Sequence, residues 1–282
     1  MNRQRNSSEG GFTLIEIAIV VVIIGLLLGG VLKGQEMIRS ARSHNVITQS
    51  NGLKAAMLGF SDRYRALPGD YSRASVNIPG ITANVVNATT GAITTVNQEG
   101  NGDSFIGGAV PPALGTNRTV ATDATGVDHA EISLVWLHLG NAGYISGGFS
   151  GVHTNVVDEV NWNCPSDVCM TNAYNGAMFI LNDNKQAGRS ATSDSAASHQ
   201  IWSGNKIPAP VISDIDSKTD DGEPGNGNFR VADRYITVCA LNSGGTASVV
   251  GVPATATTYE DAAGVVDWAI LGGETCGGVY LF

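Results

Sequence analysis

The sequence is poor in positive charge and in the motifs that most often mark catalysis. Only 16 of its 282 residues are Lys or Arg, against 25 Asp or Glu, and no dense basic cluster occurs after residue 42. The formal net charge of -9 argues against nucleic-acid binding, which depends on a basic surface. Five scattered histidines accompany no Gly-x-Ser-x-Gly, no His-Glu-x-x-His and no phosphate-binding glycine loop. We therefore expect no enzyme activity.

Charged residues of both signs are also scarce, at 15% of the chain, whereas glycine is abundant at 36 residues. Hydrophobic residues make up 43%, which is enough for a sizeable core. This composition favours a loop-rich body with short strands over a helical bundle. The sequence contains no internal repeat, so we expect one globular body.

One long apolar run is present near the start of the chain. Residues 12–32 contain a single ionisable side chain, Glu16. As a helix this run would reach about 30 Å, which is the thickness of the hydrocarbon core of a bilayer. A secretory signal peptide has a shorter apolar region followed by small residues, so we expect this segment to be retained.

Glu16 needs a physical explanation, because a carboxylate in the middle of a bilayer costs on the order of 3 kcal/mol. Cleavage between Gly11 and Phe12 would create a new ammonium group close to Glu16 in the sequence. The two charges could pair within one chain. Pairing between chains would instead turn the cost of a buried charge into a signal that sets their register. A carboxylate that rests among lipid headgroups is the alternative.

The stretch Gly11-Phe12-Thr13-Leu14-Ile15-Glu16, followed by an apolar helix, resembles the signal of type IV prepilins and pseudopilins. The resemblance implies cleavage after Gly11 by a prepilin peptidase, N-methylation of Phe12, and assembly of identical subunits into a helical filament. It gives Glu16 a role in aligning neighbouring subunits. It also implies a single-pass protein of the bacterial inner membrane, which assembly machinery in that membrane moves into a periplasmic or cell-surface filament.

The apolar helix is expected to continue beyond the membrane. No proline occurs before Pro68, and "ALPGD" at 66–70 ends the helical pattern. Apolar side chains recur at helical spacing before that point, at Val46, Leu53, Met57, Phe60 and Tyr64. We predict one helix from Phe12 to about Arg65. Glycine pairs occur in its first half, at Gly25/Gly29 and Gly30/Gly34. They permit close helix contacts in a filament, are simply tolerated by lipid, or allow the helix to unwind locally in a filament.

The predicted fold class is α+β, with this helix packed on an antiparallel sheet as in the pilin family. The chain divides into a leader (1–11), a membrane-spanning segment (12–32), an amphipathic continuation of the helix (33–65) and a globular domain (66–282). Strands are expected at "AMFILN" from Ala177, "RYITVCAL" from Arg234, "VVDWAIL" from Val265 and "GVYLF" at the end. We expect loops and short strands over 72–128 and an exposed loop over 186–199.

A second helix is expected within residues 129–145, where apolar residues share one helical face and Gly143 ends the pattern. Glu131 and His138 lie two turns apart on this helix. We interpret them as a polar pair on the surface rather than as a catalytic pair.

Two acidic stretches could bind calcium as a cofactor. Within 97–106, oxygen-bearing side chains alternate as at the start of an EF-hand loop, at Glu99, Asn101 and Asp103, but no bidentate Glu closes the loop. Within 214–229, five carboxylates crowd together and a cation would relieve their repulsion: Asp214, Asp216, Asp220, Asp221 and Glu223. The predicted ligands among them are Asp220, Asp221 and Glu223. In both stretches the alternative is a solvated turn without metal.

The four cysteines permit three disulfide connectivities. Cys164 and Cys169 would close a small local loop. A bridge from Cys239 to Cys276 would resemble the carboxy-terminal disulfide of many type IV pilins. Zinc is the rival interpretation, but an exported chain favours oxidation, and the Cys164–Cys169 spacing is wider than in a zinc knuckle.

The leading hypothesis is a non-enzymatic subunit of a type IV pilus-like filament. A pseudopilin of type II secretion would carry the same signal, and the large body hints at a specialised subunit without excluding a major one. A solitary membrane-tethered binding protein, which only borrows the leader motif, is a hypothesis of a different class.

Overall fold

The computed structural model describes residues 14–83, 98–106, 131–151, 164–183, 198–232, 239–242, 265–268 and 276–282. The chain divides into two compact units, Met1–Ala41 and Arg42–Phe282. The division falls inside the segment that the sequence predicts to be the amphipathic part of the first helix. Residues 12 and 13, at the predicted start of that helix, lie outside the described residues.

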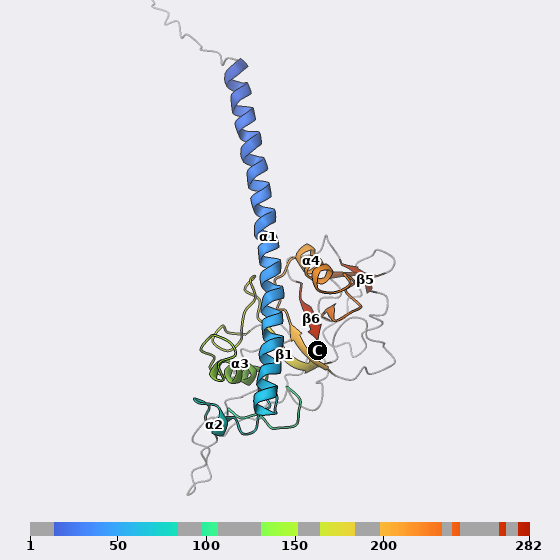
Figure 1. Cartoon of the computed structure of the whole chain (residues 1–282). Helices are drawn as coiled ribbons and strands as arrows, with labels where there is room; N and C mark the ends of the chain where they lie inside the picture. Colours follow the sequence, from blue (N-terminus) through green and yellow to red (C-terminus); the bar gives the residue numbers. More distant parts are fainter. Residues whose placement is uncertain are drawn as a thin grey trace, which may run out of the picture. The chain divides into compact units, whose positions relative to one another are not determined.

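The first element, α1, spans Leu14–Tyr64 (Figure 1). In the part of α1 that belongs to the second unit, the buried residues follow helical spacing, with steps of three or four positions and one adjacent pair: Ser43, Val46, Ser50, Leu53, Ala56, Met57 and Phe60. This spacing confirms the predicted amphipathic stripe, with Tyr64 partly buried at its end. Gly52 and Gly59 do not interrupt the helix, because packing along its buried face outweighs their weak helix propensity.

The helix ends through left-handed backbone at two positions. Arg65 has φ 54° and Gly69 has φ 91°. A Cβ atom at Gly69 would lie 2.6 Å from the carbonyl oxygen of Glu131, so only glycine fits where this turn meets the next long helix. A short helix, α2 (Ala74–Asn77), follows. The prediction of loops and short strands over 72–128 missed this helix, and residues 84–97 and 107–128 lie outside the described part of the chain.

The main sheet has four antiparallel strands in the order β1-β2-β6-β3. They are β1 (Phe179–Asp183), β2 (Ser198–Trp202), β3 (Phe229–Val231) and β6 (Gly278–Leu281). One row of paired residues crosses all four strands as Ile180, Ile201, Tyr280 and Phe229, and each of these side chains is fully buried. This row forms part of the core, since apolar cross-strand neighbours stabilise a sheet by mutual burial.

Two of the predicted strands form a separate sheet. β4 (Ala240–Asn242) pairs with β5 (Val265–Trp268) in an antiparallel two-stranded sheet. The predicted single sheet was therefore wrong, although the predicted fold class, a long helix with an antiparallel sheet, is confirmed. In the main sheet, β6 lies between β2 and β3, and the sequence did not predict either of these two strands. β3 is very short, and β2 carries polar residues at His199 and Gln200.

Two further helices pack on the sheets. α3 (Glu131–Asn141) contacts β1, and α4 (Ala209–Thr219) contacts β3 and β5 (Figure 1). All eight residues from Ile132 to Leu139 are buried, so α3 is an internal helix rather than the one-faced helix that the sequence predicted. The exposed loop was predicted over 186–199, but its last two residues, 198 and 199, belong to β2. The other residues of that prediction lie outside the described part of the chain.

Candidate functional site

The first acidic loop is organised around a carboxylate that the sequence interpretation had left out. Asp70, in the turn after α1, accepts backbone hydrogen bonds from Gly102 at 2.7 Å and Asp103 at 3.0 Å on one oxygen. Its other oxygen accepts from the backbone N–H of Ser104 at 2.9 Å. Burial raises the pKa of Asp70, and these three donors act in the opposite direction. The loop is therefore held by a carboxylate of the chain itself.

Two of the three calcium ligands predicted in this loop contact each other: the Asn101 side chain donates to Asp103 at 3.0 Å, and the Asp103 N–H donates to Asn101 Oδ1 at 2.8 Å. Glu99 accepts hydrogen bonds from the backbone N–H of Ser75 and from its hydroxyl group, at 3.3 and 2.5 Å. Asp103 instead lies near Asp70 and Glu131, with one oxygen of each within 4.8 Å of the others. Asn101 contacts this group, because its backbone N–H donates to Glu131 at 3.1 Å.

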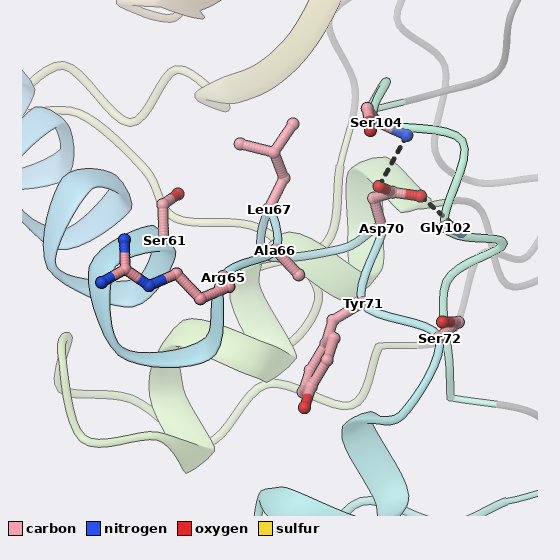
Figure 2. Close-up of a pocket in the computed structure, with 9 residues that line it drawn as sticks. All are labelled: Ser61, Arg65, Ala66, Leu67, Asp70, Tyr71, Ser72, Gly102 and Ser104. Atoms are coloured by element: carbon pink, nitrogen blue, oxygen red, sulfur yellow. Dashed lines mark hydrogen bonds between the residues drawn. The ribbon is translucent and has the colours of Figure 1, made fainter.

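A polar pocket of about 440 Å³ lies beside this loop (Figure 2). Figure 2 shows the Asp70 carboxylate bonded to Gly102 and Ser104, while the Arg65 side chain comes from the end of α1. The residues that line the pocket are Ser61, Arg65, Ala66, Leu67, Asp70, Tyr71, Ser72, Gly102 and Ser104. The lining residues that the structure describes offer hydroxyl groups, one carboxylate and one guanidinium, and none of these hydroxyl groups is hydrogen-bonded to a base, as acyl or phosphoryl transfer would require.

His138 is buried, contrary to the predicted polar pair on the surface. The backbone N–H of Gly69 donates to its Nδ1 at 2.9 Å, and its Nε2 lies 2.8 Å from the carbonyl oxygen of Gln98. Burial lowers the pKa of His138 to about 4. Glu131 makes its hydrogen bond to Asn101, so the proposed partner of His138 is engaged elsewhere. His138 joins α3 to the turn after α1 and to the first acidic loop.

The second acidic stretch also gathers around a carboxylate that the predicted ligand set left out. Asp216 is on α4, and one of its oxygens lies within 4.8 Å of an oxygen on Asp220 and one on Asp221. Burial raises the pKa of Asp216 to about 7, and the charges of Asp221 and Asp220 add to the increase. The predicted ligand Glu223 instead accepts a hydrogen bond from the Asn226 side chain at 2.6 Å.

The sequence contains a signal for each of these carboxylates. Asp70 belongs to "ALPGD", the stretch that ends the helical pattern, and Asp216 lies in the second acidic stretch, one helical turn before Asp220. Neither signal is specific by itself, because each carboxylate has partners that are distant in the sequence. Asp70 binds backbone groups at Gly102 and Ser104, and Asp216 accepts a hydrogen bond from Trp268.

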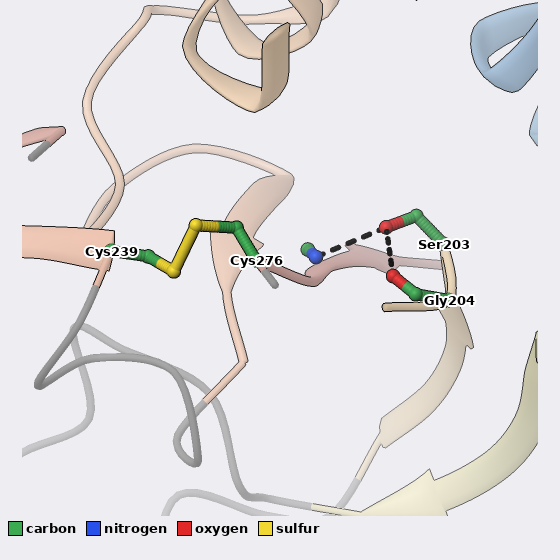
Figure 3. Close-up of a disulfide and its surroundings, with 5 residues drawn as sticks. Ser203, Gly204, Cys239 and Cys276 are labelled. Carbon is green, nitrogen blue, oxygen red and sulfur yellow. Dashed lines mark hydrogen bonds between the residues drawn. A yellow bond between two sulfur atoms is a disulfide. The ribbon is translucent and has the colours of Figure 1, made fainter. Parts of the chain in front are cut away.

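The structure pairs Cys164 with Cys169 and Cys239 with Cys276, the two bridges that the sequence favoured. In the chain-entropy model, the short loop contributes about 2 kcal/mol and the longer one about 4 kcal/mol to stability. Figure 3 shows the second bridge beside Ser203, whose hydroxyl group accepts from the backbone N–H of Gly278 at 3.0 Å. This bridge fastens Cys239, next to β4, to the residue that precedes β6 by two positions.

The N-terminal part of α1 exposes an almost continuous apolar surface. Leu14 is 88% exposed, and every described residue up to Leu32 is exposed. A Cβ atom built at Gly25, Gly29 or Gly30 would meet no atom within 4 Å. Among the described residues, this is the one helix that is long and apolar enough to cross a membrane. Glu16 lies in its first turn, whereas Gly11 and Phe12 lie outside the described residues.

Comparison with known proteins gives one match in the chain. The family model of the prokaryotic N-terminal methylation motif matches residues 6–32. The chain carries a prepilin-type signal. This signal is shared by type IV pilins and pseudopilins, as the sequence resemblance implied. No curated protein and no solved structure matches the chain.

The prepilin-type signal accounts for the exposed apolar surface of α1 and for the carboxylate of Glu16 within it. It marks substrates of prepilin peptidase, and together with the apolar helix it fits anchoring in the inner membrane before assembly. The matched residues include Gly11, Phe12 and Glu16. The signal is typical of structural pilin-type proteins. It supports processing by prepilin peptidase and assembly into filaments.

Proposed function

We propose that the chain is a non-enzymatic structural subunit of a type IV pilus-like filament. In this proposal a prepilin peptidase removes residues 1–11, the amino group of Phe12 is methylated, and the mature subunit assembles with copies of itself through α1. The match of residues 6–32 to the N-terminal methylation motif is the observation that supports the proposal most directly.

The physical basis of assembly is the exchange of one apolar environment for another. An isolated chain leaves the side chains from Leu14 to Leu32 exposed, and in water this surface would favour aggregation. Lipid covers it before assembly, and neighbouring helices cover it in a filament. Glycines without nearby atoms, at Gly25, Gly29 and Gly30, allow close approach of helix backbones, which is how helices gain contact energy in an apolar medium.

Glu16 supplies the alignment. Within the membrane or the filament core a carboxylate is costly unless it meets a positive charge, and the ammonium group of a processed Phe12 is such a charge. We propose that the Phe12 ammonium of one subunit contacts Glu16 of the next. An apolar surface alone permits many registers between helices, whereas one charge pair selects a single register.

The test replaces Glu16 by Ala and measures processing and assembly separately. We expect Glu16→Ala to insert in the membrane and to be cut after Gly11, but to yield far fewer filaments in the sheared fraction. The matched control is Glu36→Ala, because Glu36 is an exposed helical carboxylate that pairs with Lys33 at 2.7 Å, outside the matched motif. A normal filament yield from Glu16→Ala would refute the alignment role.

A pseudopilin of type II secretion is the second candidate, because the prepilin-type signal is common to both classes. Mass spectrometry of sheared surface filaments separates the two. A main component that begins with methylated Phe12 supports the pilus. Recovery of the processed chain only from detergent-extracted membranes supports the pseudopilin. Recovery of an unprocessed chain that still begins at Met1 would support a solitary tethered binding protein and would contradict both filament proposals.

A further inference from the structure

The loop after α4 contains a buried carboxylate oxygen without a hydrogen-bond partner. Asp216 is 0% exposed. Its Oδ2 accepts a hydrogen bond from the indole Nε1–H of Trp268 at 2.8 Å. The backbone N–H of Gly222 also favours the charged carboxylate, but no donor meets hydrogen-bond geometry at Oδ1. Buried carboxylate oxygens are costly when they are left unsatisfied, so the position of this oxygen requires a physical reason.

Two further carboxylates converge on Asp216. One oxygen each from Asp216, Asp220 and Asp221 lies within 4.8 Å of the others. Calcium binds oxygen at 2.3–2.6 Å, so two ligands of one ion lie up to about 5 Å apart. The three oxygens are therefore spaced as the ligands of a single ion can be. We propose that Asp216, Asp220 and Asp221 bind a calcium ion that supplies the missing partner of Asp216.

The surrounding loop holds two of these carboxylates in place. Asp220 accepts backbone hydrogen bonds from Asn228 and from Phe229, the latter at 3.0 Å. Gly227, with φ 68°, lies so close to this carboxylate that a Cβ atom would collide with it. Asp221 accepts from the backbone N–H of Glu223 through Oδ1 at 2.9 Å. Each of these carboxylates has a second oxygen with which to contact an ion.

Within the described part of the chain, no Lys, Arg or His forms a salt bridge with Asp216, Asp220 or Asp221. Lys54 on α1 interacts electrostatically with Asp220, but its ammonium group lies over the ring of Tyr280, 4.8 Å from the ring centre. The adjacent acid Asp214 is paired with Lys218 at 2.7 Å, so it belongs to a different contact. Oxygen ligands with a net negative charge favour a hard divalent cation, and an irregular loop suits calcium better than the strict octahedral geometry of magnesium.

The first acidic loop provides an internal comparison. Its group of Asp70, Asp103 and Glu131 contains no buried oxygen without a partner among the described residues. Three backbone N–H groups of this loop already donate hydrogen bonds to the Asp70 carboxylate, so the loop is held without a cation. We therefore place calcium at the second acidic loop, with Asp216 replacing Glu223 in the ligand set that the sequence predicted.

The experiment uses the full chain in detergent after treatment with EDTA, and it measures the thermal midpoint with and without Ca²⁺. We expect Ca²⁺ to raise the midpoint by a few degrees, on the order expected for a ligand present well above its dissociation constant. Asp221→Asn keeps the acceptor for the Glu223 N–H but loses one ligand charge, so it should weaken Ca²⁺ binding by roughly tenfold or more. Asp103→Asn, in the first loop, is the matched control and should keep the response.

A second readout does not depend on stability. Tb³⁺ commonly replaces Ca²⁺, and Trp268 is hydrogen-bonded to the proposed ligand Asp216. Excitation of tryptophan should therefore sensitise Tb³⁺ emission in the wild-type chain, Ca²⁺ should displace it, and Asp216→Asn should abolish it. Absence of both the midpoint shift and the emission in the wild type would overturn the proposal. Responses that survive in Asp216→Asn and Asp221→Asn but disappear in Asp103→Asn would also overturn it, because they would place the ion in the first loop.

Discussion

His138 gives the sharpest test of how the body is held together, because its hydrogen bonds fix its protonation state. The backbone N–H of Gly69 can only donate, so Nδ1 must accept and carry no proton. The carbonyl oxygen of Gln98 can only accept, so Nε2 must carry the proton. The folded protein therefore requires neutral His138, and protonation would break the Gly69 contact and place a cation beside the ring of Phe60.

The sign and size of the effect follow from the pKa. Burial lowers the pKa of His138 from 6.5 to about 4, so between these values the unfolded chain binds more protons than the folded protein. The contribution of neutral His138 is complete above pH 6.5 and is lost as the pH falls toward 4. We expect a loss of about 2 kcal/mol between pH 8 and pH 5, and of about 3 kcal/mol below pH 4.

Asp216 works against this trend in the wild type. Its pKa is raised to about 7, so its folded form retains a proton that the unfolded chain has released, and this term destabilises the protein as the pH rises from about 4 to 7. The two dependences overlap and partly cancel. The His138 term therefore has to be isolated by comparison with His138→Gln, which does not titrate and which leaves Asp216 unchanged.

The assay is guanidinium unfolding of the full chain in detergent with EDTA, followed by tryptophan fluorescence from pH 4.5 to 8. His138→Gln should be less stable at every pH, because it loses packing and one hydrogen bond. Its deficit should be largest at pH 8 and should shrink by about 2 kcal/mol at pH 5. A deficit that does not change with pH would refute the assignment of a neutral, buried histidine.

Two further substitutions test the contacts around the end of α1, both by the same unfolding assay. Asp70→Asn should destabilise the protein by about 1–3 kcal/mol, because an amide nitrogen cannot accept from the backbone donors that the carboxylate now satisfies, whereas exposed Asp62→Asn should change little. Gly59→Ala should destabilise by about 1 kcal/mol, because its Cβ would lie 2.8 Å from the Tyr144 ring, whose hydroxyl group donates to the Gly59 carbonyl. Gly52→Ala has no atom within 4 Å and should stabilise by up to about 1 kcal/mol, so equal effects at the two glycines would contradict this explanation.

The sequence predicted α1 well because each signal for it is local. A continuous apolar run, a stripe at helical spacing and Pro68 at the end all lie within the segment that they describe. The prepilin-type signal is local in the same way, since it consists of adjacent residues that a family model recognises at 6–32. Strands with apolar residues, such as β1 and β6, were also found, since burial leaves its pattern in the strand itself.

The predictions that failed concern residues whose role depends on distant partners. His138 was interpreted as a surface residue because it lies two helical turns from Glu131 and could share its face, and only its contacts with Gly69 and Gln98 show that it is internal. The predicted calcium ligands depend on the fold in the same way. Spacing within a loop predicted Glu99 and Glu223, but both accept hydrogen bonds from protein donors, and the fold places Asp70 beside Asp103 and Asp216 beside Asp220 and Asp221.

The contrast between the two parts of the chain has a consequence for assembly. Residues 6–32 carry the recognisable signal, and the contacts that close the body, at Asp70, His138 and the disulfide bridges, involve only residues beyond Ala41. A substitution at Glu16 should therefore leave the unfolding of the body unchanged while it impairs filaments. A substitution such as Asp70→Asn should lower stability while the chain is still processed after Gly11. If either substitution produced both effects in equal measure, the separation between signal and body that underlies the proposed function would be wrong.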